Sequence, residues 1–323
     1  MQHAFQWHGG DDALAVGQQH GLAQLAVPRD LANFTIPNRL RIVAGGGGLP
    51  RIEIANQLGA AHVYLHGAHV SHFQPAGQQP VLWLSAKSLF ANDKPIRGGV
   101  PLCWPWFGPH SERKDVPGHG FARLKTWSLS ETAQLSDGRT RAVLTLADDV
   151  ASMAQWPHAF RLRYTVTVGR ELELDLRVDN PGATPFSYEE ALHTYLTVSD
   201  VRQTSVDGLA GIAYLDKVRD FARLVQEGAV TFTAETDRIY LDTVATCTVV
   251  DQVGKRRLAI AKNGSADTVV WNPWITKAMA MADFGDDEWT GMVCVETVNT
   301  GKHAIELAPG ASHHLVARVG IAS

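Results

Sequence analysis

Two ionisable residues lie in segments that alternate like strands, and their side chains are suited to proton transfer. His193 is in the segment 191–198, Ala-Leu-His-Thr-Tyr-Leu-Thr-Val, where alternation puts it on a polar but uncharged face. A histidine there can donate or accept a proton near neutral pH, because its unperturbed pKa is about 6.5. A structural histidine, hydrogen-bonded to its neighbours, is the competing interpretation and the more frequent case for a single histidine.

Glu296 lies in a mostly apolar segment, 292–299, with the sequence Met-Val-Cys-Val-Glu-Thr-Val-Asn. Alternation puts its carboxylate on the same face as Met292, Cys294 and Val298. Burying an ionised carboxylate without partners is costly. This group is therefore paired, hydrogen-bonded, or shifted toward a pKa useful for base catalysis. The sequence leaves a carboxylate held by a nearby arginine and a catalytic base equally open.

The segment 94–127 mixes arginines, histidines, tryptophans, glycines and prolines in a way that no core strand or helix requires. Glycine and proline fix special backbone angles, so this segment is predicted to be a shaped loop that forms a wall of a small-molecule pocket. From such a loop, Arg97 and Arg123 can offer their planar guanidinium groups to a phosphate or carboxylate. Surface ion pairing explains either arginine alone, but their joint occurrence favours an anion site. His119, beside Gly120, is predicted to contact the substrate.

Aromatic residues provide flat apolar surfaces against which the C–H face of a sugar ring can lie. In the segment 271–274, Trp-Asn-Pro-Trp, the proline interrupts a strand and Asn272 offers a donor and an acceptor, which favours a binding rim formed with Trp271. Asp237 can accept hydrogen bonds from sugar hydroxyls, although an ordinary Asp–Arg pair in a turn is the competing interpretation. Core packing is the more frequent explanation for the other aromatic residues of these segments, Trp104, Trp106, Phe107 and Trp274.

Four histidines that fall close together raise the question of a metal site: His62, His66, His69 and His72. On a strand, His69 would face away from the other three, and the set would not form a compact three-histidine site. We therefore expect no bound metal.

The 323-residue chain has a globular composition, with 45% hydrophobic residues. Its formal net charge is -4 with both signs interspersed, so no long positive patch is available for nucleic acid or an anionic membrane. It lacks the Gly-x-x-x-x-Gly-Lys-Ser/Thr loop of nucleoside triphosphate sites, a signal-like beginning and any membrane-length apolar run. The three cysteines are widely spaced, which fits a reducing compartment. We expect a cytoplasmic protein that binds neither nucleic acid nor membrane.

Short segments of alternating apolar and polar residues must position these side chains. The clearest are 162–168 and 172–178, which flank Gly169-Arg170, a predicted two-residue hairpin turn with glycine where positive φ is easy. Similar segments recur at 142–146, 230–233, 258–261 and 315–319. A short helix is expected at 13–25, and long amphipathic helices are hard to find. The pattern predicts an all-β protein, a large antiparallel β-sandwich with a few short helices.

These motifs resemble the aldose 1-epimerase (galactose mutarotase-like) superfamily, and more closely its hexose-6-phosphate mutarotase branch. The matching motifs are Lys-Pro-Ile-Arg-Gly-Gly-Val-Pro at 94–101, His-Gly-Phe-Ala-Arg at 119–123, Ala-Leu-His-Thr-Tyr at 191–195, Thr-Asp-Arg-Ile-Tyr at 236–240, Trp-Asn-Pro-Trp at 271–274 and Cys-Val-Glu at 294–296. Their order and spacing cover the chain from about Arg41 to its end. We therefore expect one mutarotase-like domain over 41–323, with residues 1–40 as an N-terminal extension packed on it.

The resemblance implies an enzyme without cofactor or metal that interconverts the α and β anomers of a hexose 6-phosphate, with glucose 6-phosphate as the expected substrate. In the family, the histidine matching His193 is the general acid and the glutamate matching Glu296 is the general base. The arginines matching Arg97 and Arg123 bind substrate, with the phosphate as their expected target. The aspartate matching Asp237 binds sugar hydroxyls. We expect the protein to be a monomer.

One position departs from the family pattern, and two alternatives stay open. The residue before the His-Gly-Phe-Ala-Arg motif is often glutamine in this branch and is Gly118 here, so a side-chain contact is missing at that point. The first alternative is an epimerase for unphosphorylated aldoses. The second is a non-catalytic carbohydrate-binding β-sandwich, which gives no reason for Glu296 in an apolar strand. A glycoside hydrolase is less favoured because only one candidate buried carboxylate is found.

Overall fold

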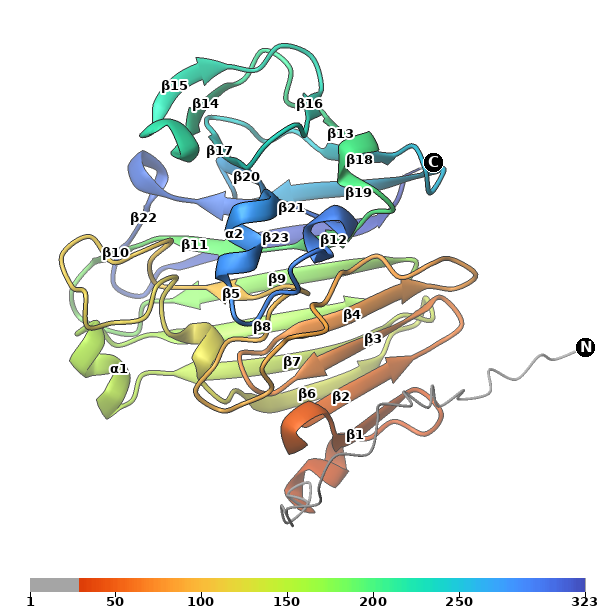
Figure 1. The fold of residues 1–323 in the computed structure, drawn as a ribbon. Helices are drawn as coiled ribbons and strands as arrows, with labels where there is room; N and C mark the ends of the chain where they lie inside the picture. The colour runs from red at the N-terminus through yellow and green to blue at the C-terminus, as the bar shows by residue number, and fades with distance from the viewer. Residues whose placement is uncertain (1–28, 323) are drawn as a thin grey trace, which may run out of the picture.

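The computed structural model describes residues 29–322 (Figure 1). The helix expected at 13–25 lies outside the described residues, as does most of the expected N-terminal extension, 1–40. The described part of that extension begins with a 3₁₀ helix, η1 (Arg29–Phe34), which packs on strands β1 and β6. Thr132 Oγ1 donates a hydrogen bond to the Phe34 carbonyl at 2.8 Å, which ties this segment to the sheet.

Antiparallel strands dominate the described residues, as the sequence predicts. The first sheet contains β1 (Leu40–Ala44), β2 (Pro50–Ala55), β3 (Gly59–Tyr64) and β4 (Val70–Pro75). A nine-stranded sheet has the order β16 (Val230–Thr231), β13 (Thr204–Asp207), β18 (Cys247–Asp251), β19 (Arg256–Asn263), β23 (Ser312–Ile321), β9 (Glu171–Asp179), β8 (Arg161–Val168), β7 (Thr140–Ala147), β6 (Ser128–Gln134).

An eight-stranded sheet carries most of the candidate residues. Its order is β15 (Ala222–Val225), β14 (Ala213–Asp216), β17 (Thr236–Tyr240), β20 (Asp267–Asn272), β21 (Met292–Asn299), β11 (Glu190–Leu192), β5 (Leu102–Cys103), with β12 (Tyr195–Thr197) also on β21. A separate pair joins β10 (Phe186–Tyr188) to β22 (Ile305–Leu307).

The helices are few and short, which also agrees with the prediction. Within residues 29–322 the two α-helices are α1 (Val150–Gln155) and α2 (Trp274–Ala280). The remaining 3₁₀ turns are η2 (Gly46–Gly48), η3 (Ala122–Leu124), η4 (Val201–Gln203), η5 (Lys217–Arg219), η6 (Glu288–Gly291) and η7 (Gly301–His303). No helix in the described part of the chain is long and apolar enough to cross a membrane.

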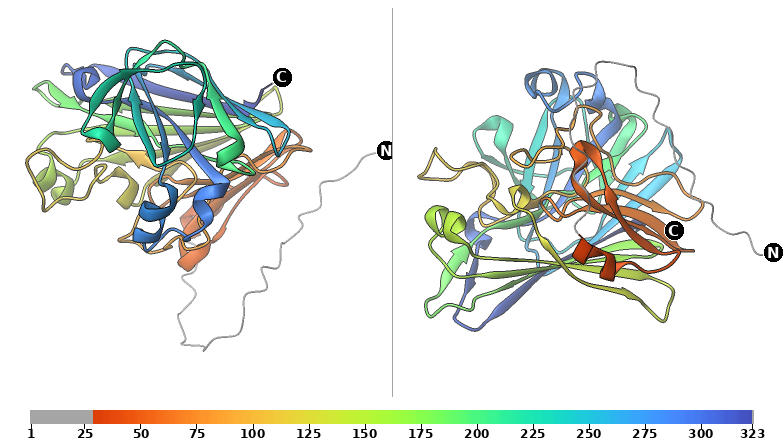
Figure 2. Two further views of the ribbon diagram at one scale, coloured as in Figure 1. Left: turned by 45° about the horizontal axis from the view of Figure 1, so that its top comes forward. Right: turned by 90° about the horizontal axis from the view of Figure 1, so that it is seen from below.

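The two large sheets pack against each other and share one core. Strands β11 and β21 contact β23 across the interface, and β3 of the first sheet contacts β8. Figure 2 shows this layering from two further directions. Most buried apolar residues of the three larger sheets belong to one hydrophobic cluster, as expected of a sandwich whose inner faces interdigitate.

The β8–β9 hairpin bears out the predicted alternation but corrects the predicted turn. The apolar residues of 162–168 and 172–178 are buried. The last paired residues are Val168 and Leu172, so the loop has three residues rather than two. Gly169 does not adopt positive φ, and its N–H donates to the Glu171 carbonyl at 3.0 Å. Glycine fits there because a Cβ would lie 2.9 Å from the Arg139 side chain.

Three of the other predicted strands are confirmed, since 142–146 lies in β7, 258–261 in β19 and 315–319 in β23. The segment predicted at 230–233 is shorter than expected. Strand β16 ends at Thr231, because only Val230 and Thr231 find partners on β13.

The four clustered histidines make contacts within the fold that are typical of structural residues. The rings of His62 and His72 meet at a tilt across β3 and β4, with centroids 4.9 Å apart. Nε2 of His66 hydrogen-bonds with the Lys94 carbonyl at 2.7 Å. His69 is only 2% exposed. Burial, and next the charge of His66, lowers the pKa of His69 to about 3.

The buried His69 predicts a loss of stability in acid. The unfolded chain takes up a proton on this residue below about pH 6.5, whereas the folded protein does so only near pH 3. Stability is therefore lost as the pH falls through this window, by about 2 kcal/mol at pH 5. Urea unfolding at pH 7 and pH 5 measures the loss. We expect it to shrink in His69→Gln but not in His314→Gln, an exposed histidine; equal pH dependence in both variants would contradict the assignment.

Candidate functional site

The strand register brings His193 and Glu296 together. His193 lies between β11 and β12, which both pair with β21. The register that pairs Leu192 with Thr297 and Tyr195 with Cys294 puts His193 directly opposite Glu296. Directly opposite residues of antiparallel strands project their side chains to the same face of the sheet. The pair is therefore a cross-strand neighbour pair between segments about a hundred residues apart.

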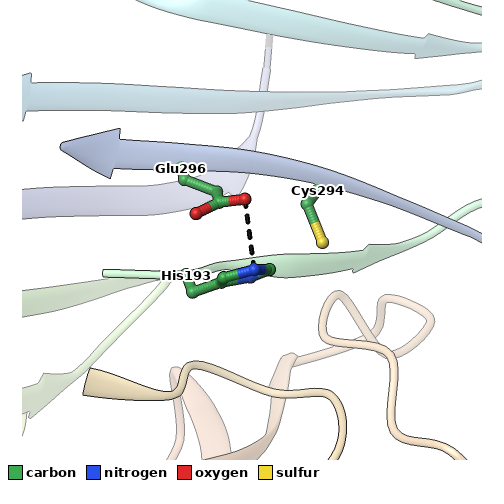
Figure 3. Close-up of side chains that lie close together, drawn as sticks. All are labelled: His193, Cys294 and Glu296. Carbon is green, nitrogen blue, oxygen red and sulfur yellow. Dashed lines mark ion pairs between the residues drawn. The ribbon is translucent and has the colours of Figure 1, made fainter. Parts of the chain in front are cut away.

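The two side chains are in contact and nearly inaccessible to solvent. Nε2 of His193 lies 3.3 Å from Oε1 of Glu296, as Figure 3 shows. The exposed fractions are 9% for His193 and 1% for Glu296. Nδ1 of His193 and Oε2 of Glu296 have no hydrogen-bond partner among the described residues. The pair thus has polar atoms left to interact with a bound molecule.

Burial shifts the two groups in opposite directions. It raises the pKa of Glu296 well above the ordinary value, and the charge of Asp237 adds to the shift. Burial also lowers the pKa of His193 well below the ordinary value, with further contributions from His119 and Arg123. Both effects disfavour a net charge on the pair. The shifts therefore favour a pair that holds one proton, shared between an acid and a base.

A second row of cross-strand neighbours lies beside the pair. Asp237 of β17 pairs with Trp271 of β20, Trp271 pairs with Cys294 of β21, and Cys294 pairs with Tyr195 of β12. All four side chains face the same side as His193. The Tyr195 ring stacks on the His193 ring with centroids 4.8 Å apart, and Trp271 meets His193 edge-on at 6.0 Å.

Apart from Cys294, the residues of these two rows form the floor of a pocket with a volume of about 200 Å³. The residues that line it are Arg97, Phe107, His119, His193, Tyr195, Lys217, Asp237, Val269, Trp271, Lys277, Met281 and Glu296. The sheet supplies the floor, and loops and α2 supply the walls.

The loop predicted as a pocket wall holds Arg97 at the pocket. Its Nη1 donates to the Tyr195 hydroxyl at 3.1 Å, and its Nη2 lies 3.1 Å from the Asp283 carboxylate. Gly99 follows with a φ of 58°, and a Cβ there would lie 2.2 Å from the Val70 carbonyl oxygen. Glycine is therefore required for this loop to pass so close to β4.

His119 also lies in the pocket, beside His193. The two rings meet edge-on with centroids 5.9 Å apart. Nδ1 of His119 accepts a hydrogen bond from the Gly108 N–H at 3.2 Å. Burial, and next the charge of Arg123, lowers the pKa of His119 well below its ordinary value. A neutral imidazole here can hydrogen-bond a sugar hydroxyl.

Arg123 lies next to this group but is not among the residues that line the pocket. Its Nη2 donates to the Gly118 carbonyl at 2.9 Å, and it forms no ion pair within residues 29–322. A Cβ at Gly118 would lie 3.6 Å from the Gly108 carbonyl oxygen, an ordinary contact. The backbone therefore leaves room for a Cβ at this position.

Of the predicted rim residues, Trp271 lines the pocket and Asn272 does not. Because side chains alternate along β20, Asn272 faces away from the pocket and is fully buried. Its Nδ2 donates to the carbonyls of Trp289 and Met292 at 2.8 and 2.9 Å. Its Oδ1 accepts from the Trp274 N–H at 2.9 Å. Asn272 thus fixes the entry into α2 rather than contacting a ligand.

The remaining predicted aromatic residues divide between core and pocket. Trp104 is fully buried in a cluster with Phe121 and Phe160. Trp106 donates its indole N–H to the Pro117 carbonyl at 2.9 Å. Both therefore match the core interpretation, whereas Phe107 lines the pocket.

Two lysines of the pocket wall were not predicted from the sequence. Lys217, from η5, lies 3.0 Å from the Asp237 carboxylate and 5.7 Å from the centre of the Phe107 ring. Lys277, from α2, lies 2.8 Å from Glu235 and 3.8 Å from Asp237. Lys277 follows the Trp-Asn-Pro-Trp segment, so a helix after that motif would have pointed to it. Nothing in the local sequence singles out Lys217.

Comparison with known proteins agrees with this geometry. A family model described as Aldose 1-epimerase matches residues 50–319. A protein of Cenchrus ciliaris named "Putative glucose-6-phosphate 1-epimerase" is 37% identical over 260 residues, covering 77% of this chain and 78% of its own length. An Escherichia coli K12 protein of the same name is 38% identical over 234 residues, covering 72% and 77%.

A solved structure extends the likeness to the fold. The crystal structure of a protein described as a "putative mutarotase" from Salmonella typhimurium matches with a TM-score of 0.80 at 30% identity. The match covers 88% of this chain and 97% of that one.

Proposed function

Since the chain belongs to the aldose 1-epimerase family, we propose that it interconverts the α and β anomers of a hexose 6-phosphate, with glucose 6-phosphate as the leading substrate. The observation that carries this proposal is the buried pair of His193 and Glu296 on the floor of a pocket with cationic walls. The names of two relatives, which specify glucose 6-phosphate, support the choice of substrate.

The reaction needs an acid and a base on either side of the C1–O5 bond. His193 gives a proton to the ring oxygen while Glu296 takes the proton from the C1 hydroxyl. The C1–O5 bond breaks and C1 becomes an aldehyde carbon. Rotation about the C1–C2 bond presents the opposite face of the aldehyde to the C5 hydroxyl. Both proton transfers then run in reverse and close the other anomer, with no net gain or loss of protons.

The shifted pKa values decide which proton arrangement of this cycle is favoured. Before ring opening the pair is an imidazolium and a carboxylate, and afterwards it is a neutral imidazole and a carboxylic acid. Burial raises the pKa of Glu296 and lowers that of His193, so the second arrangement is favoured inside the pocket. The pocket thereby stabilises the proton arrangement of the ring-opened intermediate relative to the ion pair, so the ion pair that opens the ring is the minor form of the pair and must form before the reaction begins.

The two arginines predicted to hold the phosphate have donors to offer. Nε of Arg97 and Nε of Arg123 are buried without a hydrogen-bond partner in the described chain. Burial lowers the pKa of Arg123, and the charge of Arg97 contributes in the same direction. A phosphate bound beside both would satisfy the unpaired donors and offset the repulsion between the two cations. Lys217 and Lys277 add positive charge along the pocket wall.

The sugar hydroxyls are assigned to the remaining pocket residues. Asp237 is held by Lys217, which keeps a carboxylate oriented at the pocket floor as an acceptor. Trp271 gives an apolar surface beside His193, and His119 offers an imidazole opposite it.

An unphosphorylated aldose is the second candidate substrate, and one observation favours it. Each cation that lines the pocket already pairs with a carboxylate: Arg97 with Asp283, Lys217 with Asp237, and Lys277 with Glu235. A neutral sugar would leave these pairs intact, whereas a phosphate must compete with them. A non-catalytic sugar-binding role predicts no anomerisation above the spontaneous rate.

Loss of the Arg97 guanidinium should weaken substrate binding more than turnover. A hydrogen bond to a charged group is worth about 1.5–3 kcal/mol, so we expect Arg97→Ala to raise KM for glucose 6-phosphate roughly 10- to 100-fold with little change in kcat. A coupled assay sensitive to one anomer measures both constants, with glucose and glucose 6-phosphate as parallel substrates.

Two further variants sharpen this test. Arg238→Ala removes an arginine on the opposite face of β17, which bonds Gln226 at 3.2 Å, and should leave the substrate preference unchanged. Arg97→Ala combined with Asp283→Asn removes both charges of the ion pair and controls for an uncompensated Asp283. Equal rates with both sugars in the unaltered protein would favour the unphosphorylated substrate. They would contradict the assignment of a phosphate site to the arginines.

A further inference from the structure

A third potential ligand atom lies beside the catalytic pair. Cys294 precedes Glu296 by two residues on β21, so both project to the pocket face. Nitrogen of His193, Sγ of Cys294 and a carboxylate oxygen of Glu296 all lie within 4.8 Å of one another. Figure 3 shows the three side chains converging from two neighbouring strands. The proposed reaction uses only two of them.

The spacing and chemistry of these atoms suit a small, borderline-soft divalent cation. Tetrahedral zinc, with bonds of about 2.0–2.3 Å, requires ligand atoms about 3.3–3.7 Å apart. Nε2 of His193 and Oε1 of Glu296 already lie 3.3 Å apart, and Sγ of Cys294 lies within 4.8 Å of both ligand groups. Imidazole and thiolate are ligands that favour zinc over magnesium or calcium.

We propose that His193, Cys294 and Glu296 form a Zn²⁺ site, and that a bound zinc ion inhibits the enzyme by occupying its acid-base pair. The inhibitory effect rests on the proposed function, whereas the binding itself does not. Zinc takes the His193 imidazole, the Cys294 thiolate and the Glu296 carboxylate as ligands. Two protons leave, one from the thiol and one from the pair, and the two anionic ligands neutralise the ion. The fourth position faces the pocket, where water completes the site.

The site differs from the four clustered histidines considered in the sequence. Those side chains are held by contacts of β3, β4 and the loop after β4. This cluster instead combines three kinds of ligand at the pocket floor. The cluster is also too enclosed for nonspecific binding of metal ions from solvent, because Cys294 has no exposed surface. An ion must enter through the pocket, so substrate and zinc exclude each other.

Cobalt(II) tests the binding without any substrate. Co²⁺ occupies zinc sites, and a bound thiolate gives a charge-transfer absorption in the near ultraviolet. We expect this band on adding Co²⁺ to the full-length protein, its displacement by one equivalent of Zn²⁺, and its absence in Cys294→Ser. Saturation with Co²⁺ without a thiolate band would overturn the proposal, whatever the enzyme's substrate proves to be.

Inhibition provides the second readout. We expect Zn²⁺ to abolish anomerisation, EDTA to restore it and Mg²⁺ to have no effect. Cys294→Ser should remain active and lose sensitivity by at least roughly 10- to 100-fold, the loss in metal affinity that removal of an outer-shell partner alone produces. Cys247→Ser removes a buried thiol of β18 in the other large sheet and should stay as sensitive as the unaltered protein.

Two results separate the possible failures. Equal zinc sensitivity of the Cys294→Ser and Cys247→Ser variants would overturn the proposed site. If Cys294→Ser does not fold, Cys294→Ala replaces it, and the cobalt spectrum of the unaltered protein still decides whether a thiolate binds. If no anomerisation is found at all, the proposed function fails while the cobalt spectrum continues to test the metal site.

Discussion

Glu296→Gln should lower the turnover of anomerisation by roughly 10²- to 10⁴-fold, the usual contribution of a general base. The amide has nearly the shape of the carboxylic acid but cannot take the proton from the C1 hydroxyl. KM should change little, because substrate binding is assigned mainly to other residues. An anomer-specific coupled assay, corrected for the spontaneous reaction, measures the loss.

The same variant should not lower the stability of the fold. Glu296 is almost fully buried, and burial raises its pKa because an ionised carboxylate is poorly solvated there. A neutral glutamine avoids that cost, so the free energy of unfolding at pH 7 should stay equal or rise. A carboxylate kept for structure would behave in the opposite way. Loss of stability together with near-normal turnover would therefore reverse the assignment.

Glu190 supplies a matched control on the neighbouring strand β11. It is also fully buried, but it accepts a hydrogen bond from Asn299 Nδ2 at 2.9 Å and lies 3.0 Å from His313. It does not line the pocket. Glu190→Gln should therefore lower stability and leave kcat unchanged, the converse of the result expected at Glu296.

His193→Asn should lower turnover by a similar factor, because it removes the acid that protonates the ring oxygen. The Tyr195 ring loses its stacking partner, so thermal unfolding and circular dichroism must show that the variant is folded. His313→Asn, a histidine outside the pocket, is the control for turnover. Near-normal turnover in a folded His193→Asn protein would exclude the acid role.

The pH dependence separates the two roles. The unaltered pair is active while it holds one proton, so its rate should fall in acid when a second proton binds and in alkali when the last one leaves. In His193→Asn the residual rate should rise with pH as Glu296 ionises, since only the base remains. Groups that act as a unit are not additive, so the double variant should cost little more than either single change.

The sequence by itself determined the elements and the chemistry they carry. Alternation identifies the β8–β9 hairpin and strands β7, β19 and β23, because it reports directly which residues share a face. A carboxylate in the apolar segment 292–299 and a histidine in 191–198 mark the acid-base groups. Both properties are local, and each can be recognised without knowing where the rest of the chain lies.

Only the tertiary structure decided which of these groups meet. Alternation gives the face of a side chain but not its partner strand, and the register of Leu192 on Thr297 is what sets His193 opposite Glu296. The pairing of Trp271 with Asp237 and Cys294 places Trp271 on the pocket face of the sheet, and alternation along β20 then turns Asn272 away from it. Which faces of β20 and β21 line a pocket depends on packing between segments far apart in the chain.

The residues that form the pocket wall could not be predicted from the sequence either. Lys217 and Lys277 reach Asp237 from η5 and α2, which are separated by about sixty residues and approach only because β17 and β20 are neighbours in the sheet. Cys294 reads locally as one more apolar residue of a strand, and becomes a potential metal ligand only when β12 and β21 align. The local sequence determines which chemistry a side chain can perform. The pairing of segments far apart in the chain determines which other groups it meets.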